Sequence, residues 1–320
     1  MTKIIDFAHL SRVSLRETEM VDWVDDALRM KQQVILPAKL SLKPDATTFF
    51  NVMPTIIPAL QVAGVKVVNR YATRQPALDS QIMLYDLKTG GLKAIMDGNF
   101  ITTARTGAVA AHSVRLLAKH DFTSVGVIGL GNQARSAVKA LLALFPNRDL
   151  TINLYAFQGQ ERDFRAYLMT LPGHERLTIT DVPTVAALFA ASEVILSALT
   201  YAEADLLPDP TMMRPGTLLV PIHTRGFMNL DCVVDRVYCD DVAQVQGFKY
   251  FKDFKHLAEV AEVLQEPSLG RQTDEERITV YNIGLALHDI FFAAKLYDKV
   301  QAEATASIEL TPPTEKVWYW

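Results

Sequence analysis

A short segment at residues 129–134, GLGNQA, has the residue types and spacing of a phosphate-binding turn. It follows the apolar run SVGVI and opens a stretch, QARSAVKALLALF, with apolar residues at helical spacing. In such a strand–turn–helix unit Gly129 permits the tight turn, Gly131 lets the backbone approach a pyrophosphate, and Ala134 lets helix and strand pack closely. The phosphate charge would lie at the helix N-terminus, where free N–H groups favour anions. The segment therefore predicts a dinucleotide site, the alternative being a glycine turn that binds nothing.

The acidic residue that usually binds the ribose about twenty residues after such a turn is absent. Ala156, Phe157 and Gln158 stand at the end of the next apolar segment instead. Without a carboxylate to repel a 2′-phosphate, the sequence favours NADP(H) slightly over NAD(H), with Arg162 as a phosphate partner. Neighbouring loops can supply either contact, so both coenzymes stay open.

Three cations are candidates for binding an anionic substrate. Arg105 starts a helix of small residues, where it makes either a surface ion pair or, if buried, a fork for a carboxylate or phosphate. Lys66, in GVKVV, lies on the strand face opposite Val65 and Val67, so it faces either solvent or a cleft, where a lysine can act as acid or base. Lys39, in LPAKLSL, has the same ambiguity.

The composition is that of an ordinary globular protein: 49% of the residues are apolar and 21% charged, and the net charge is −4. This balance argues against a nucleic-acid partner. The two cysteines and the seven histidines show no metal-ligand spacing, so no metal site is expected. No uninterrupted apolar stretch approaches the length needed to cross a bilayer, and we expect a cytoplasmic protein without a membrane partner.

The pattern of the elements that position these residues predicts an α/β fold. Residues 17–32 form an amphipathic helix pattern on Met20, Val24 and Leu28, and segments 64–73 and 80–98 read as strands with a turn at residues 89–91. From residue 124 short apolar strands alternate with helices, which requires a mainly parallel sheet covered on both faces.

The C-terminal part is predicted as one long buried helix followed by a tail. The segment TVYNIGLALHDIFFAAKLYDKVQAEA, from Thr279, is apolar on more than one face, and a return to the first domain would bury it. The tail ELTPPTEKVWYW either packs on a neighbouring subunit or docks loosely.

The segments GVKVV, DGNFITTARTGAVAA and VGVIGLGNQARSA resemble, in order and spacing, the ornithine cyclodeaminase/mu-crystallin family of NAD(P)-dependent proteins. The resemblance runs from about Pro37 to ITVYNIGLALHD and covers most of the chain. It implies a Rossmann-type doubly wound parallel sheet at residues 116–285, inserted in a discontinuous α+β substrate-binding and dimerisation domain at residues 1–115 and 286–320. It also implies a homodimer, with the active site in the cleft between the domains.

The resemblance implies roles for individual residues as well. Arg105 is similar to the family's clamp for the substrate α-carboxylate, Lys66 to the lysine beside the reacting carbon, and Lys39 stands where the family usually has an arginine. Asn282 stands where many members have serine. The residues that match the coenzyme-binding positions are Gly129, Gly131, Asn132, Gln133, Ala134, Ser197, Ala198, Leu199 and Gly284.

One departure from the family pattern decides the expected reaction. Cyclodeaminases resemble each other in a G-A-D-x-P-G-K-x-E-L-D stretch whose first aspartate handles the substrate amine. Here the segment is PIHTRGFMNLD, which puts Thr224 at that position, next to His223. Ornithine cyclisation needs a carboxylate to hold and deprotonate the distant ammonium, whereas reduction of a preformed cyclic imine needs a carboxylate clamp, a proton and a hydride.

We therefore expect an NAD(P)H-dependent ketimine reductase acting on a small carboxylate-bearing imino or amino acid, such as a pyrroline- or piperideine-2-carboxylate, with Lys66, Arg105 and Thr224 as catalytic positions. The alternatives are an ornithine cyclodeaminase or related amino-acid dehydrogenase, if His223 or Asp79 fills the empty position, and a non-enzymatic NADP(H)-dependent binding protein like mu-crystallin.

Overall fold

The computed structural model describes residues 1–320 apart from 46, 201, 224–225, 312 and 318–320. Within these residues the chain forms two compact units. The first unit comprises Met1–Ser14, Gln33–Thr102 and Asp289–Trp320, and the second comprises Leu15–Gln32 and Thr103–His288. Compared with the predicted boundaries, residues 15–32, 103–115 and 286–288 group with the second unit.

The first unit is built on a mixed sheet. In the described residues this sheet has seven strands in the order β15-β1-β6-β5-β4-β3-β2. Strand β1 runs parallel to β6, and the other neighbouring pairs are antiparallel. The strands are β1 (Thr2–Ile5), β2 (Leu40–Leu42), β3 (Phe49–Ile57), β4 (Val62–Arg70), β5 (Leu78–Asp86), β6 (Leu92–Asp97) and β15 (Ser307–Ile308).

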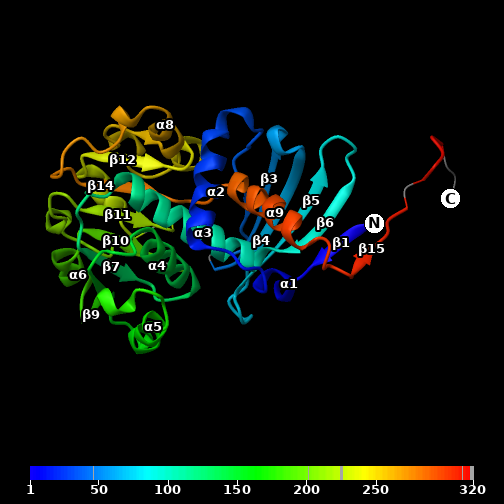
Figure 1. The fold of residues 1–320 in the computed structure, drawn as a ribbon. Helices are drawn as coiled ribbons and strands as arrows, with labels where there is room; N and C mark the ends of the chain where they lie inside the picture. Colours follow the sequence, from blue (N-terminus) through cyan, green and yellow to red (C-terminus); the bar gives the residue numbers. More distant parts are fainter. Residues whose placement is uncertain (46, 201, 224–225, 312, 318–320) are drawn as a thin grey trace. The chain divides into compact units, whose positions relative to one another are not determined.

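Helix α9 (Ala286–Val300) covers one face of the mixed sheet, and α1 (Phe7–Ser11) follows β1 (Figure 1). A Cβ atom added to Gly64 on β4 would lie 2.6 Å from Ile290 Cδ1 on α9, so a glycine is required where the helix crosses the strand. The even-numbered residues of β4 from Val62 to Lys66 are buried on this side, and the odd-numbered ones are half-buried. Helix α9 thus returns to the first unit, as its apolar composition predicted.

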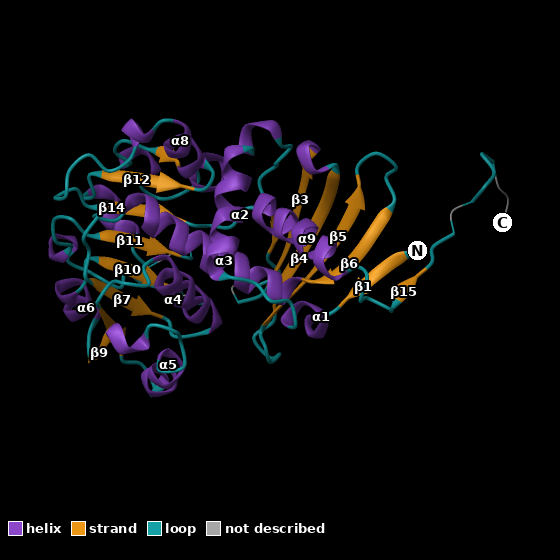
Figure 2. Ribbon diagram, viewed as in Figure 1, coloured by secondary structure: helices purple, strands orange, loops and turns teal. Residues whose placement is uncertain are grey.

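The second unit contains a parallel sheet covered by helices (Figure 2). Among the described residues this sheet has eight strands in the order β13-β12-β14-β11-β10-β7-β8-β9, and the paired strands run parallel. The strands are β7 (Ser124–Ile128), β8 (Leu150–Tyr155), β9 (Leu177–Val182), β10 (Val194–Ser197), β11 (Leu218–Pro221), β12 (Arg236–Cys239), β13 (Ala258–Glu259) and β14 (Ile278–Tyr281).

Helices α2 and α3 explain why residues 15–32 and 103–115 belong to this unit. Helix α2 packs against α4 and α8, and a Cβ atom on Gly107 of α3 would clash with Ser136 of α4. The helices are α2 (Glu17–Arg29), α3 (Gly98–Leu117), α4 (Asn132–Leu144), α5 (Gln160–Leu168), α6 (Val185–Ala191), α7 (Val242–Val245) and α8 (Val260–Gln265). The unit boundaries at residues 102 and 288 fall inside α3 and α9.

The prediction of one helix from Thr279 is wrong at its start. Residues Ile278–Tyr281 form strand β14 between β11 and β12, and α9 begins at Ala286. The β-branched and aromatic side chains of ITVY suit a fully buried strand. Gly284, at a φ of 94°, then adopts a conformation that no α-helix contains. No helix among the described residues is long and apolar enough to cross a membrane.

Candidate functional site

The candidate site of the second unit lies at the carboxyl ends of the parallel strands. The glycine turn follows β7, Ser197 ends β10, and Gly284 follows β14. Strands β7, β10, β11 and β14 are consecutive neighbours, and in a parallel sheet their carboxyl ends share one edge. Ligands of open α/β sheets bind at this edge.

The glycine turn has the geometry predicted for it. Gly129 has a φ of 77°, and a Cβ there would lie 2.7 Å from the Ala198 carbonyl, so the protein itself requires this glycine. Gly131 has an ordinary φ of −86°, and nothing lies within 4 Å of a Cβ placed on it. No side chain caps α4, so its first N–H groups are not taken up by a capping side chain, and helix N-termini of this kind favour anions.

Ser197, Ala198 and Leu199 lie beside this turn. Ala198 donates its N–H to the Ile128 carbonyl at 2.8 Å, which joins the ends of β10 and β7. The Oγ of Ser197 is 2.7 Å from His223 Nε2, so His223 lies at the same edge as the turn. Thr224, the predicted position of the missing aspartate, lies outside the described residues.

A carboxylate from the following helix lies beside the end of β8, where the sequence predicts no acidic residue. Glu161, in the first turn of α5, accepts a hydrogen bond from the Phe157 N–H at 3.1 Å. Arg162, the predicted phosphate partner, is 89% exposed and lies 3.8 Å from the Asp163 carboxylate. The carboxylate was overlooked because it comes from the helix after the strand rather than from the strand end.

Arg105 is buried in the second unit, at 8% exposure, which excludes the surface ion pair. Its guanidinium lies against Gly284, where an added Cβ would be 3.0 Å from Nη1 and 3.1 Å from Nη2. Asn282, two residues earlier, accepts a hydrogen bond from Ser113 of α3 at 3.2 Å, and its Nδ2 is buried without a partner among the described residues. Asn282 therefore has a buried amide donor that no described residue satisfies.

Lys66 is buried in the first unit, at 1% exposure, and donates to Asp289 of α9 at 2.8 Å. The sequence left its direction open, and the structure turns it toward α9 while Val65 and Val67 occupy the half-buried face. Continuing the β2–β3 register by one residue would put Lys39 in the row of Met53 and Lys66. The ion pair fixes the direction of the Lys66 ammonium.

Asp79 does not share this arrangement. It lies on β5 three residues from Ile82, the residue paired with Lys66, and therefore points to the opposite face of the mixed sheet. Its carboxylate accepts hydrogen bonds from Asn99 at 2.8 Å and from Gln81 at 2.9 Å. Asp79 therefore does not share a sheet face with Lys66, and the hypothesis that it fills the position of the missing aspartate stays a prediction.

Comparison with known proteins gives the chain's relationships. The model of the ornithine cyclodeaminase/mu-crystallin family matches residues 2–304. The chain belongs to this family.

Individual relatives are distant. The Delta(1)-pyrroline-2-carboxylate reductase of Bacillus thuringiensis subsp. konkukian is 25% identical over 264 residues, which cover 78% of this chain and 80% of that protein. The nodulation efficiency protein NfeD of Rhizobium meliloti is 24% identical over 273 residues, 82% of this chain and 83% of that protein. The solved structure of Thermococcus litoralis Delta(1)-pyrroline-2-carboxylate reductase with NADH and L-proline has a TM-score of 0.83 at 20% identity, covering 96% of this chain and 100% of that one. This likeness establishes the family's Rossmann-type fold.

A buried carboxyl group, Asp231, lies in the segment where this family member departs from the cyclodeaminase pattern. Asp231 is 0% exposed and accepts a hydrogen bond from the Tyr281 hydroxyl at 2.7 Å, while its Oδ2 has no partner among the described residues. Burial raises its pKa to about 7; the negative charge of Asp205 adds to this, and the Tyr281 hydrogen bond opposes it. The pair ties the segment after β11 to the end of β14.

The raised pKa of Asp231 predicts a pH-dependent stability. The folded protein keeps a proton on Asp231 up to about pH 7, whereas the unfolded chain releases it near 3.8, so the unfolding free energy should fall as the pH rises between these values. The loss should reach up to about 4 kcal/mol. Asp231→Asn should remove this part of the pH dependence in urea unfolding between pH 4.5 and 7.5, and Asp163→Asn, an exposed control, should not. If the unfolding free energy of wild type and of Asp231→Asn changed with pH in the same way, the prediction would be contradicted.

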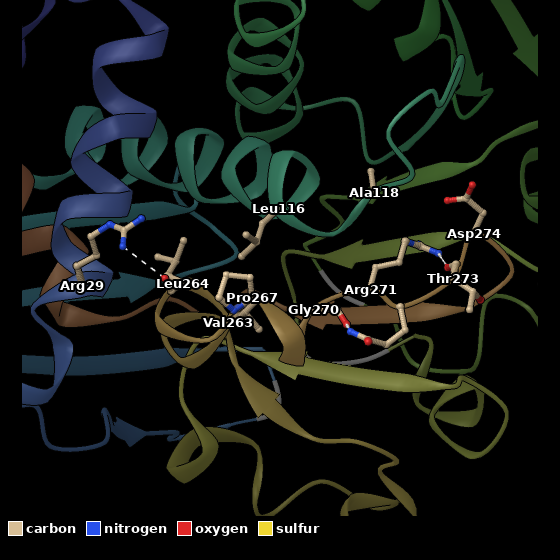
Figure 3. Close-up of a pocket in the computed structure, with 11 residues that line it drawn as sticks. Arg29, Leu116, Ala118, Val263, Leu264, Pro267, Gly270, Arg271, Thr273 and Asp274 are labelled. Carbon is tan, nitrogen blue, oxygen red and sulfur yellow. Dashed lines mark hydrogen bonds between the residues drawn. The ribbon is translucent and has the colours of Figure 1, made fainter.

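Two pockets of the second unit lie at the opposite, amino edge of the parallel sheet. One, of about 690 Å³, is lined by Arg29 and Leu116 and by residues of the segment before β14 (Figure 3). The Arg271 guanidinium there donates to the backbone carbonyls of Leu117 and Glu276, at 2.8 and 2.7 Å. The other, of about 430 Å³, adjoins the starts of β7, β10 and β11. Neither faces the glycine turn, and Arg271 of the first pocket holds the backbone.

The described residues contain no group of three or more histidine, cysteine, aspartate or glutamate side chains that could hold a metal ion. Burial raises the pKa of the Cys239 thiol, and nearby carboxylates, chiefly Asp240, raise it further, so this cysteine is no nucleophile.

Proposed function

We propose that the protein is a nicotinamide-dependent reductase of cyclic imino acids, the class represented by pyrroline- and piperideine-2-carboxylate. The observation that carries the proposal is the pairing of a coenzyme turn with a buried guanidinium, Arg105, in one unit. The Bacillus relative, whose name states this activity, supports the same substrate class.

The buried carboxylates favour imine reduction over ornithine cyclisation. Asp240 accepts the Gly284 N–H at 2.7 Å, Asp289 pairs with Lys66 at 2.8 Å, and Asp231 accepts the Tyr281 hydroxyl at 2.7 Å. Each of these groups already accepts a hydrogen bond from the protein through one oxygen, and none of them stands at the sequence position of the missing aspartate, whereas cyclisation needs a carboxylate for the distant substrate ammonium. An imine reductase has no such requirement.

The proposed roles follow from the charges. Arg105 binds the substrate carboxylate through two parallel N–H···O bonds, and Lys39 adds positive charge. Lys66 donates the proton that the imine nitrogen takes up, while His223, held by Ser197, is the second group able to carry a proton. The nicotinamide coenzyme supplies the hydride when bound. Carbon and nitrogen of the imine thereby gain one hydride and one proton.

For the coenzyme we propose NADH. The sequence favours NADP(H) slightly because no acid stands at residues 156–158. In the structure, however, the Glu161 carboxylate lies at the Phe157 N–H, and Arg162 points to solvent. A carboxylate at this end of the site binds ribose hydroxyls and repels a 2′-phosphate.

The proposal is tested by following the absorbance at 340 nm with purified protein, each cyclic imino acid, and NADH or NADPH. We expect imine-dependent oxidation with a higher kcat/KM for NADH. Coenzyme binding without turnover on any imine would favour a binding protein instead. A higher kcat/KM for NADPH would overturn the coenzyme assignment alone.

We also propose a homodimer formed through the mixed sheet. The face of this sheet opposite α9 carries half-buried apolar side chains from neighbouring strands: Val52, Pro54, Ile56, Ala63, Val65, Val67 and Met83. A continuous apolar sheet face of this kind is typical of a protein interface. Light scattering should give twice the chain mass, and Val65→Lys should lower it; a wild-type monomer would contradict the proposal.

A further inference from the structure

Gly284 is held on both sides by the segment that follows β12. Its N–H donates to Asp240 Oδ2 at 2.7 Å, and its carbonyl accepts from Gln244 Nε2 at 3.3 Å. The φ of Gly284 is 94°, and a side chain there would meet the Arg105 guanidinium within 3.1 Å. Gly284 therefore forms a flat surface against which the guanidinium lies, and Asp240 fixes that surface.

Asp240 is itself fixed by a cluster of charges. It is 1% exposed, and its carbonyl accepts a hydrogen bond from Lys31 Nζ at 2.8 Å. Lys31 also contacts Glu259 at 2.6 Å and Asp241 at 3.1 Å, and Glu259 accepts the Val242 N–H at 2.9 Å. The backbone from Asp240 to Val242 is thus held by Lys31, which follows α2, and by Glu259 of β13.

We propose that Asp240 is a positioning residue for the substrate-binding guanidinium of Arg105, acting through the Gly284 backbone. The proposal rests on the proposed function, in which Arg105 binds the substrate carboxylate. A bidentate pair tolerates little displacement of the guanidinium plane, and a shift of about 1 Å lowers rates roughly 100-fold. Removing the acceptor for the Gly284 N–H frees the Gly284 backbone, which would then no longer hold the plane of the Arg105 guanidinium.

The proposal requires an acceptor at position 240 rather than a charge. Asp240→Ala should raise the KM for the imino acid about 100-fold with the KM for coenzyme unchanged within threefold. Asp240→Asn keeps an oxygen for the Gly284 N–H and should restore the KM to within about fivefold. A purely structural role would lower the melting temperature of both variants without this separation of the two KM values.

Asp241→Ala is the matched control. Asp241 also contacts Lys31, and it caps α7 by accepting the Ala243 N–H at 2.8 Å. The Gly284 N–H, however, donates to Asp240. Its replacement should change stability and leave the KM for the imino acid unchanged. If Asp240→Ala does not fold, Gln244→Ala, which removes the longer bond to the Gly284 carbonyl, should raise the same KM about tenfold.

A crystal structure of Asp240→Ala separates the failure of this proposal from the failure of the proposed function. Movement of Arg105 away from Gly284 would support the positioning role whichever substrate the enzyme takes. An unmoved guanidinium, or an unchanged KM in an enzyme that reduces the imine, would overturn it. Displacement of Arg105 in a protein that reduces no imine would overturn the proposed function alone.

Discussion

Arg105→Lys is expected to lower kcat/KM for a cyclic imino acid by about 1,000-fold, because lysine replaces two charge-assisted hydrogen bonds by one point contact. The loss should appear chiefly in the KM for the imino acid. The affinity for NADH, measured by fluorescence titration, should stay within threefold, since the glycine turn is untouched. Steady-state kinetics with both substrates varied gives each quantity.

The control for Arg105 lies on the same helix. Arg115, ten residues further along α3, is 35% exposed and pairs with Asp22 and Asp25. Arg115→Lys should change kcat/KM less than twofold, because an exposed ion pair contributes little. Equal losses in the two variants would show that α3 tolerates no substitution and would remove Arg105 from the proposed clamp.

Lys66→Met is expected to lower kcat by about 100- to 1,000-fold and to destabilise the protein by about 3–5 kcal/mol. The first effect follows from loss of the proposed proton donor. The second follows because Asp289, 0% exposed, would lose a buried ion-pair partner 2.8 Å away. Assays at saturating substrate and urea unfolding measure the two effects separately.

A double variant separates the two roles of Lys66. Lys66→Met with Asp289→Leu removes both charges, so stability should recover while activity stays low. Lys88→Met, at an exposed lysine of the turn between β5 and β6, should change neither quantity. Recovery of activity in the double variant would rule out Lys66 as the proton donor and leave His223 as the candidate.

Residues whose roles depend on local geometry were the ones that the sequence could predict. The strand, Gly129 and the start of α4 are consecutive in the chain, so their spacing alone predicts the turn, and the structure confirms it. Arg105 lies in the third turn of α3 rather than at the start of a helix, and its role as a carboxylate clamp, implied by the family resemblance, stays a prediction. The pattern of strands and helices from residue 124 likewise predicted the parallel sheet.

Residues that act through distant partners could not be predicted in this way. Whether Lys66 or its neighbour Val65 faces the core depends on α9, more than 220 residues later, and the alternation of β4 suits either choice. Asp240 and Gly284 are 44 residues apart in the sequence, and no local sequence pattern near either residue predicts the hydrogen bond between them. Glu161 was missed because its carboxylate returns to the Phe157 N–H from the next helix.

The most direct test of the central claim compares two reactions on one preparation of the protein. One assay follows oxidation of NADH with Δ1-pyrroline-2-carboxylate, and the other measures ammonia released from L-ornithine with NAD+. We expect rapid imine-dependent oxidation of NADH and no ammonia above the background. Release of ammonia with formation of proline from ornithine would contradict the account, and a group that handles the substrate side-chain amine would then have to be present.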